Sequence, residues 1–130
     1  MKRLFYPAIF HPEDVGFSVK IPDIDGCFTE GDTLAEAYRN SVEAIGINLE
    51  DISDPKNFPD PSNPATLTVP HGDFVAIIEF DMIDYTRRHS TKSVKKTLTI
   101  PSWLNAEAEA HHINFSSVLQ AALKQQLGIQ

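Results

Sequence analysis

Val94-Lys95-Lys96-Thr97-Leu98-Thr99-Ile100-Pro101 (VKKTLTIP) is the stretch that decides the fold of the C-terminal part of the chain. Its β-branched residues predict a short strand, and Pro101 stops it. Ser102 is expected to cap a first helix, and Asn114 to end it in the left-handed conformation. Ser116 is expected to cap a second helix, with Gly128 after it. The predicted order is therefore strand, helix, helix, and the apolar residues of the two helices are Trp103, Leu104, Ala108, Ile113, Val118, Leu119, Ala122, Leu123 and Leu127.

A single strand of this length cannot stand alone, because its backbone donors and acceptors would be unpaired and its apolar face would stay wet. Two copies solve both problems by pairing their strands into an antiparallel ribbon over a shared helical core. Leu98 and Ile100 would then face inward. A two-stranded ribbon fits the major groove of DNA, and helix N-termini bind phosphates. The residues expected to contact DNA are Lys95, Lys96, Thr97, Thr99, Ser116 and Ser117; the alternative is a strand and helical hairpin that only dimerises.

The same residues resemble a known family. Lys96-Thr97-Leu98-Thr99-Ile100-Pro101-x-Trp103-Leu104 is similar to the strand and first turn of ribbon-helix-helix DNA-binding domains. Asn114-Phe115-Ser116-Ser117, followed by Leu119, Gln120, Ala122 and Leu123, is similar to their second helix. That family often carries an Arg near the position of Ser116, and this chain has none there. The resemblance implies a β-α-α dimerisation domain over residues 94–130 with a weaker hold on phosphate.

Charge divides the chain in a way that its net value of −7 hides. Residues 1–86 contain sixteen Asp and Glu against five Lys and Arg, a net charge of −11. Residues 87–130 contain two against six, a net charge of +4. This break predicts two modules with different partners, and the basic one is the nucleic-acid candidate.

The first module is predicted to be one sheet with a helix on one face. Strands are expected at 4–10, 17–21 and 27–29, and Pro7 favours an edge position or a bulge for the first. Thr33 and Glu36 form a capping box for a helix over 33–50. A loop with five prolines over 54–70 leads to a strand at 73–80, whose continuous apolar run predicts cover on both faces. Residues 82–93 lose the apolar pattern and are expected to be a linker.

This half of the chain also resembles a family. Gly16-Phe17, then Pro22-Asp23-x-x-Gly26-Cys27-x-x-x-Gly31-Asp32-Thr33-x-x-Glu36-Ala37, is similar to the antitoxins of the HicB family. The resemblance implies an α+β protein with a truncated ribonuclease-H-like β-β-β-α-β domain at 1–85 and a linker at 86–93. It further implies that this domain neutralises a small basic ribonuclease toxin of the HicA type. The C-terminal domain, as a dimer or higher oligomer, would bind operator DNA and repress the operon. The acidic charge independently suits a basic partner.

Four carboxylates gather in the turns before the predicted helix, namely Asp23, Asp25, Glu30 and Asp32. They are the residues expected to contact the toxin, because an exposed acidic loop can mimic an RNA backbone. Clustered carboxylates also hold paired Mg²⁺ ions in nucleases, but Asp and Glu are common in turns and at helix starts for local reasons. We therefore expect no catalytic residue, no metal and no cofactor. Two alternatives stay open, a regulator whose first domain senses a small ligand and a metal-dependent nuclease.

The cellular compartment is predicted mainly from features that the sequence lacks. The chain has one cysteine, Cys27, which fits a reducing compartment and a small buried side chain. No apolar stretch approaches the length of a membrane helix, and the N-terminus lacks the apolar core of a signal peptide. The sequence predicts a cytoplasmic protein.

Overall fold

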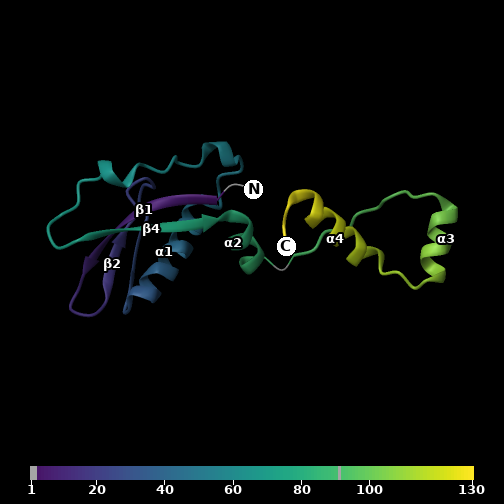
Figure 1. Ribbon diagram of the computed structural model, residues 1–130, viewed down its shortest axis with the longest axis horizontal. Coiled ribbons are helices and arrows are strands. Elements are labelled where there is room, and N and C mark those ends of the chain that lie inside the picture. Colours follow the sequence, from purple (N-terminus) through teal and green to yellow (C-terminus); the bar gives the residue numbers. More distant parts are fainter. Residues whose placement is uncertain (1–2, 91) are drawn as a thin grey trace. The chain divides into compact units, whose positions relative to one another are not determined.

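The structure is a computed structural model that describes residues 3–90 and 92–130. The chain forms two compact units; residues 3–90 belong to the first unit and residues 92–130 to the second. Each unit is described by itself below, and Figure 1 labels most of their helices and strands.

The first unit contains a four-stranded antiparallel sheet in the order β3-β2-β1-β4. The strands are β1 (Arg3–Pro12), β2 (Phe17–Lys20), β3 (Phe28–Gly31) and β4 (Phe74–Asp81). All four predicted strands are therefore present. A helix between two strands normally makes them parallel. Here the helix joins β3 to β4, and β3 runs parallel to β1 because both are antiparallel to β2. β4 runs antiparallel to β1, so the two strands that the helix joins are antiparallel.

Pro7 does not place β1 at an edge, as its sequence predicted. β1 is a central strand, paired with β4 from Arg3 to Phe10 and with β2 only from Ile9 to Pro12. Pro7 thus lies where β2 has already ended, so no neighbour on that side requires its missing N–H. The proline is fully buried. A central strand accepts it because one of its two ladders is short.

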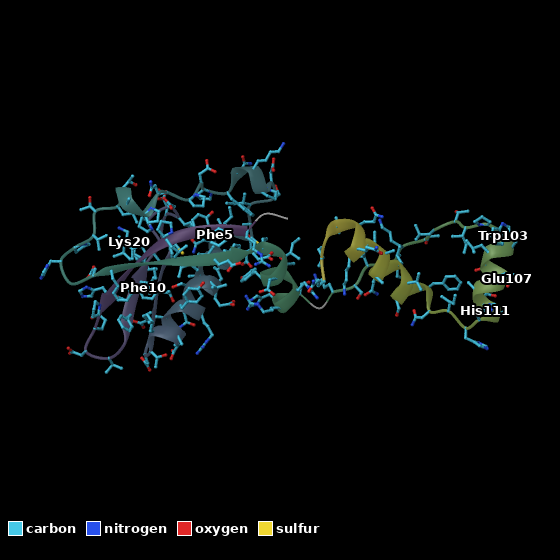
Figure 2. The ribbon with its side chains drawn as sticks, viewed as in Figure 1. Phe5, Phe10, Lys20, Trp103, Glu107 and His111 are labelled. Carbon is cyan, nitrogen blue, oxygen red and sulfur yellow. The ribbon has the colours of Figure 1, made fainter. Side chains whose placement is uncertain are left out.

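The helix α1 (Leu34–Leu49) packs on one face of the sheet. Its predicted cap is confirmed, since the Thr33 hydroxyl accepts from the Glu36 N–H at 3.1 Å. Gly31 allows β3 to approach closely, because a Cβ there would lie 2.3 Å from the Ala37 nitrogen. Figure 2 shows Phe10 of β1, which is fully buried in the core. The other residues of this core are Leu4, Tyr6, Ala8, Val19, Ile21, Ile24, Cys27, Ala37, Ile45, Leu49, Ile78, Phe80 and Tyr85.

A second helix, α2 (Met82–His89), occupies most of the segment predicted to be a linker. Asp81 caps it by accepting from the N–H groups of Ile83 and Asp84. Tyr85 is buried against α1, where a Cβ on Gly46 would lie only 2.2 Å from its ring. The linker prediction is therefore wrong for residues 82–89. Tyr85 is the one buried residue of this short helix, too weak an apolar signal to show in the sequence.

The Pro-rich connection has little regular structure, as predicted, and contains only the short 3₁₀ helices η1 (Pro55–Asn57) and η2 (Pro64–Thr66). Two hydrogen bonds attach it to β1 and to the loop between β2 and β3. The Tyr6 hydroxyl donates to the Pro59 carbonyl at 2.6 Å, and the Asp23 carboxylate accepts from the Ser62 N–H at 2.8 Å. The loop is therefore a packed part of the first unit.

The face of the sheet opposite α1 is only partly covered, which corrects the expectation for β4. Residues facing α1, such as Ile78 and Phe80, are fully buried. On the opposite face Phe5 is 51% exposed and Ile77 40%. The apolar run of β4 therefore does not mean cover on both faces.

The second unit contains α3 (Ser102–Ala110) and α4 (Phe115–Leu127) but no assigned strand. Residues 92–100 are irregular, because a strand is defined by its pairing and this segment has no partner here. Ser102 is the first residue of α3 rather than its cap, and α3 ends before Ile113. Asn114 caps α4 by accepting from the Ser117 N–H, so Ser116 lies inside the helix. His112, with φ 54°, adopts the left-handed conformation expected at Asn114, and Gly128 ends α4 as predicted.

Candidate nucleic-acid interface and acidic surface

A groove of about 600 Å³ in the second unit brings together four of the six residues predicted to contact DNA. Lys95, Lys96 and Thr97 line it from the extended segment, and Ser116 lines it from the start of α4. Val94, Leu119 and Leu123 add apolar side chains to its lining. Thr99 and Ser117 do not line the groove. The backbone N–H of Ser117 is already engaged by Asn114 at 3.0 Å.

The second unit buries none of its described side chains. Leu98 is 61% exposed, Trp103 68% and Leu127 61%. Figure 2 labels Trp103 and Glu107 on α3 and His111, the residue that follows the helix. Other large apolar side chains exposed here are Val94, Ile100, Leu104, Ile113, Phe115, Val118 and Leu123. Apolar surface on this scale, on so small a unit, marks a site where another chain packs.

The backbone of the extended segment is equally incomplete. Between residues 92 and 100, no backbone N–H or carbonyl makes a hydrogen bond to another backbone group of the described chain. The first such bond beyond it is made by the Pro101 carbonyl, which accepts from the Asn105 N–H at 3.0 Å. A row of unpaired groups of this kind is a template for pairing with another strand.

The structure moves the charge boundary. Arg88 belongs to α2 in the first unit, where it contacts Glu43 at 2.5 Å and Asp84 at 3.1 Å. Residues 1–91 then hold sixteen acidic and seven basic side chains, a net charge of −9, and residues 92–130 hold four lysines and two glutamates, a net charge of +2. The contrast in sign persists, but it is smaller than the sequence division suggested.

The four predicted toxin-contact carboxylates do not share one environment. Asp23 is partly buried, and Ser62 donates to it through both its N–H and its hydroxyl. Asp25, Glu30 and Asp32 are exposed. Asp23 thus shapes the junction of two loops, whereas the other three are open to a partner. In the described part of the chain, no three His, Cys, Asp or Glu side chains are grouped as metal ligands would be.

Sequence reasoning missed a polar network that holds α2 to α1. Glu43 contacts Arg88 and also His89 at 2.6 Å, while the Tyr85 hydroxyl donates to Glu50 at 3.0 Å. Burial alone would raise the pKa of Glu43, but the hydrogen bonds from Arg88 and His89 outweigh it and lower that pKa. These partners lie far apart in the sequence, so no local pattern marked them.

Two buried groups have strongly shifted pKa values. Burial raises the pKa of the Cys27 thiol to about 11, which keeps it neutral and unreactive near neutral pH. Burial, with the nearby carboxylates of Asp23 and Asp60, raises the pKa of Tyr6 to about 12. Cys27 is therefore the small buried residue that the sequence predicted.

Comparison with known proteins decides the family. The model of a family described as HicB-like antitoxins of bacterial toxin–antitoxin systems matches residues 6–123. The chain belongs to this HicB-like family. A protein of Haemophilus phage HP1 (strain HP1c1), described as an uncharacterized 14.9 kDa protein in the rep-hol intergenic region, is 32% identical over 103 residues. That match covers 78% of this chain and 76% of the phage protein.

Solved structures of the HicB-like family share this fold. The chain matches a toxin–antitoxin complex from Streptococcus pneumoniae with a TM-score of 0.60 and 25% identity, covering 96% of this chain and 99% of that one. It matches an antitoxin HicB3 with a TM-score of 0.52 and 26% identity over 95% and 97%. The HicB antitoxin of Burkholderia pseudomallei matches in fold, with a TM-score of 0.50 and 22% identity over 96% and 97%. The mixed α+β fold and the HicB-like assignment are thus confirmed. No helix of the described ranges has the length and apolar character needed to cross a membrane.

Proposed function

We propose that this HicB-like protein neutralises a small basic ribonuclease toxin of the HicA type through its first unit. Its second unit, as a ribbon-helix-helix dimer, binds operator DNA and represses its own operon. The observation that carries the proposal is that the second unit is incomplete. Its side chains are unburied and the backbone of 92–100 is unpaired within the described chain, and both deficits are met by a second copy of the same unit.

DNA recognition follows from what the paired segments would present. With Leu98 and Ile100 turned toward the shared core, the alternate residues Lys95, Thr97 and Thr99 lie on the outer face of the ribbon. The groove beside Ser116 already places Lys95 and Thr97 near the start of α4, whose N-terminus favours phosphate. The net charge of +2 per copy doubles in a dimer and supports contact with the DNA backbone.

Toxin neutralisation is supported by the charge of the first unit and by the family. A net charge of −9 steers a basic ribonuclease toward this unit. Asp25, Glu30 and Asp32 are exposed and available for contact, and Asp23 contributes by holding their loop to Ser62. The order β-β-β-α-β with the helix on one face supports its interpretation as a truncated ribonuclease-H-like domain.

Toxin steering is tested by kinetics with matched charge removal. Asp25→Asn with Glu30→Gln should slow association with a HicA-type toxin, and should flatten its dependence on salt. Asp14→Asn with Asp51→Asn removes the same charge from exposed positions elsewhere in the unit and should slow association less. Equal on-rates for wild type and both double variants would reject the loop as a steering surface. RNA cleavage by the purified chain alone would favour the nuclease alternative instead.

A further inference from the structure

The free edge of β4 is the longest unpaired strand edge of the first unit. β4 and β3 are the two edge strands, with eight and four residues. Long exposed edges are usually guarded by lysine, proline or a bulge. β4 reads Phe-Val-Ala-Ile-Ile-Glu-Phe-Asp over 74–81, with neither lysine nor proline, and its register with β1 is continuous.

The proline in the neighbouring strand fixes which backbone groups point outward. In an antiparallel pair, residues alternate between positions that exchange hydrogen bonds and positions that do not. Pro7 has no N–H and lies opposite Ile77, so that pair is of the second kind. Val75 and Glu79, two residues away on either side, are then of the same kind. The N–H and carbonyl groups of these three residues therefore point away from β1, toward the free edge.

An independent contact agrees with this direction. The N–H of Glu79 donates to the hydroxyl of Tyr38 on α1 at 3.2 Å rather than to β1. Tyr38 thus closes one end of the edge. Among the described residues, the N–H groups of Val75 and Ile77 have no backbone acceptor on this side. The open part of the edge is therefore the stretch around Val75 and Ile77.

Apolar and acidic side chains flank this open stretch. Ile77 is 40% exposed, and Phe5 on the adjoining strand is 51% exposed on the same face of the sheet. At the end of the edge nearest α2, a hollow of about 280 Å³ is lined by Arg3, Tyr38, Val42, Glu79, Asp81 and Asp84. Arg3 pairs with Glu79 at 2.7 Å and lies 3.9 Å from Asp81, and Asp84 pairs with Arg88 at 3.1 Å. Three carboxylates against these two guanidinium groups leave the hollow with a net negative charge.

We propose that the toxin adds a strand to the edge of β4 and that a basic side chain of that strand enters the acidic hollow. This inference rests on the proposed toxin-binding function and names the surface that does the binding. Backbone hydrogen bonds from Val75 and Ile77 give the affinity, and the hollow selects the charge. Apolar side chains of the added strand cover Ile77 and Phe5. The exposed acidic loop acts on the rate of encounter, whereas this edge acts on the lifetime of the complex.

A second copy of this chain fits the edge less well than a basic strand. Pairing two β4 strands about Ile77 would set Asp73 of each copy against Asp81 of the other. It would also bring together two units that each carry a net charge of −9. A basic strand turns both of these repulsions into attractions.

Amide hydrogen exchange of the full chain, with and without toxin, tests the proposal directly. The amides of Val75 and Ile77 should exchange rapidly in the antitoxin alone and become protected in the complex. Tight toxin binding without protection of these two amides would overturn the strand proposal while leaving toxin neutralisation intact. Protection already present without toxin would assign the edge to a second copy and overturn it too. If wild-type protein binds no toxin, the proposed function fails and this inference fails with it.

A matched pair of variants supplies the second readout. Ile77→Lys keeps the backbone but places a positive charge at the edge, and it should weaken toxin binding on the order of tenfold, mainly through faster dissociation. Ile47→Lys makes the same change at a side chain that is 60% exposed on α1 and should leave the dissociation rate within about twofold. Melting curves confirm that both variants are folded. Equal dissociation rates for the two variants would contradict the proposal.

Discussion

The two units of this HicB-like protein contain similar kinds of residue, but the first buries its apolar side chains and the second leaves them exposed. In residues 3–90, fourteen apolar side chains are buried around a four-stranded sheet and a capped helix. In residues 92–130, Leu98, Trp103 and Leu127 are all more than half exposed and no described side chain is buried. Both sequences are rich in apolar residues, so composition alone does not explain the contrast. The first unit folds around its own core, and we propose that the second completes its core with a second copy.

The largest expected effect is on that shared core. Leu98→Asp places a carboxylate on the inner face of the proposed ribbon, in the shared core, and should cost about 3 kcal/mol, which raises the dimer dissociation constant on the order of 100-fold. Operator binding should fall with it. The measurement is sedimentation equilibrium of the full chain over a range of concentrations. Ile47→Asp, at an exposed position of the first unit, is the control. A Leu98→Asp protein that dimerises as wild type does would remove Leu98 from the interface.

The next effect separates a dimer that reads DNA from one that only dimerises. Replacing Lys95, Thr97 and Thr99 together with alanine should leave the oligomeric state unchanged, because these side chains face away from the proposed core. Each lost base contact should cost about 1–3 kcal/mol. Gel-shift titration at fixed salt measures the loss, and Lys124→Ala serves as a control that removes one charge from the same unit. Unchanged operator affinity in the triple variant would reject the outer-face assignment.

A smaller effect sharpens the description of the first unit as a closed core that includes α2. Gly46→Ala adds a Cβ whose ideal position lies only 2.2 Å from the ring of Tyr85. Either α2 or the ring must shift, at a cost of about 1–3 kcal/mol in the free energy of unfolding. Chemical denaturation of the full chain, followed by tyrosine absorbance, reports this loss. Ile47→Ala, an exposed neighbour on α1, should change stability far less, and similar losses for both variants would contradict close packing of α2.

The smallest effect concerns pH. The side-chain hydrogen bond from His11 to Asp73, at 2.6 Å, raises the pKa of His11 above its usual value. A group whose pKa is raised on folding stabilises the protein below its unfolded pKa and loses that contribution as pH rises through its folded pKa. The melting temperature of the first unit should therefore decrease slightly from pH 5.5 to about 8. His11→Gln should flatten this dependence. A melting temperature that rises over the same interval in wild type only would show that the sign is wrong.

Features encoded locally could be predicted from the sequence. The Thr33 cap and the alternation of Phe17 and Val19 depend on residues a few positions apart, and both are present. Pro7 misled because its tolerance depends on where β2 ends, which no neighbour in the sequence reveals. α2 was missed because Tyr85 and Arg88 find their partners on α1, some forty residues earlier. Asn114 and Ser116 are both good caps, and the left-handed turn at His112 decides between them.

The candidate sites divide in the same way. The lysines and threonines of the extended segment stay a prediction, because the structure assigns no strand to residues 92–100 that would give their side chains a face. The free edge of β4 could not be foreseen, because it depends on strand order and on the position of Pro7 opposite Ile77. The role of Asp23 also required the fold, since its partner Ser62 lies in a distant loop.

The central claim is that residues 94–100 form a strand only by pairing with the same residues of a second copy. An NMR sample that mixes isotope-labelled and unlabelled full-length protein tests this most directly, because filtered spectra show only contacts between copies. We predict backbone contacts between the two segments that contain Thr97, Leu98 and Thr99, in an antiparallel pattern. Contacts between copies that involve α3 and α4 but never these three residues would contradict the account, because such a dimer would have no ribbon to present to DNA.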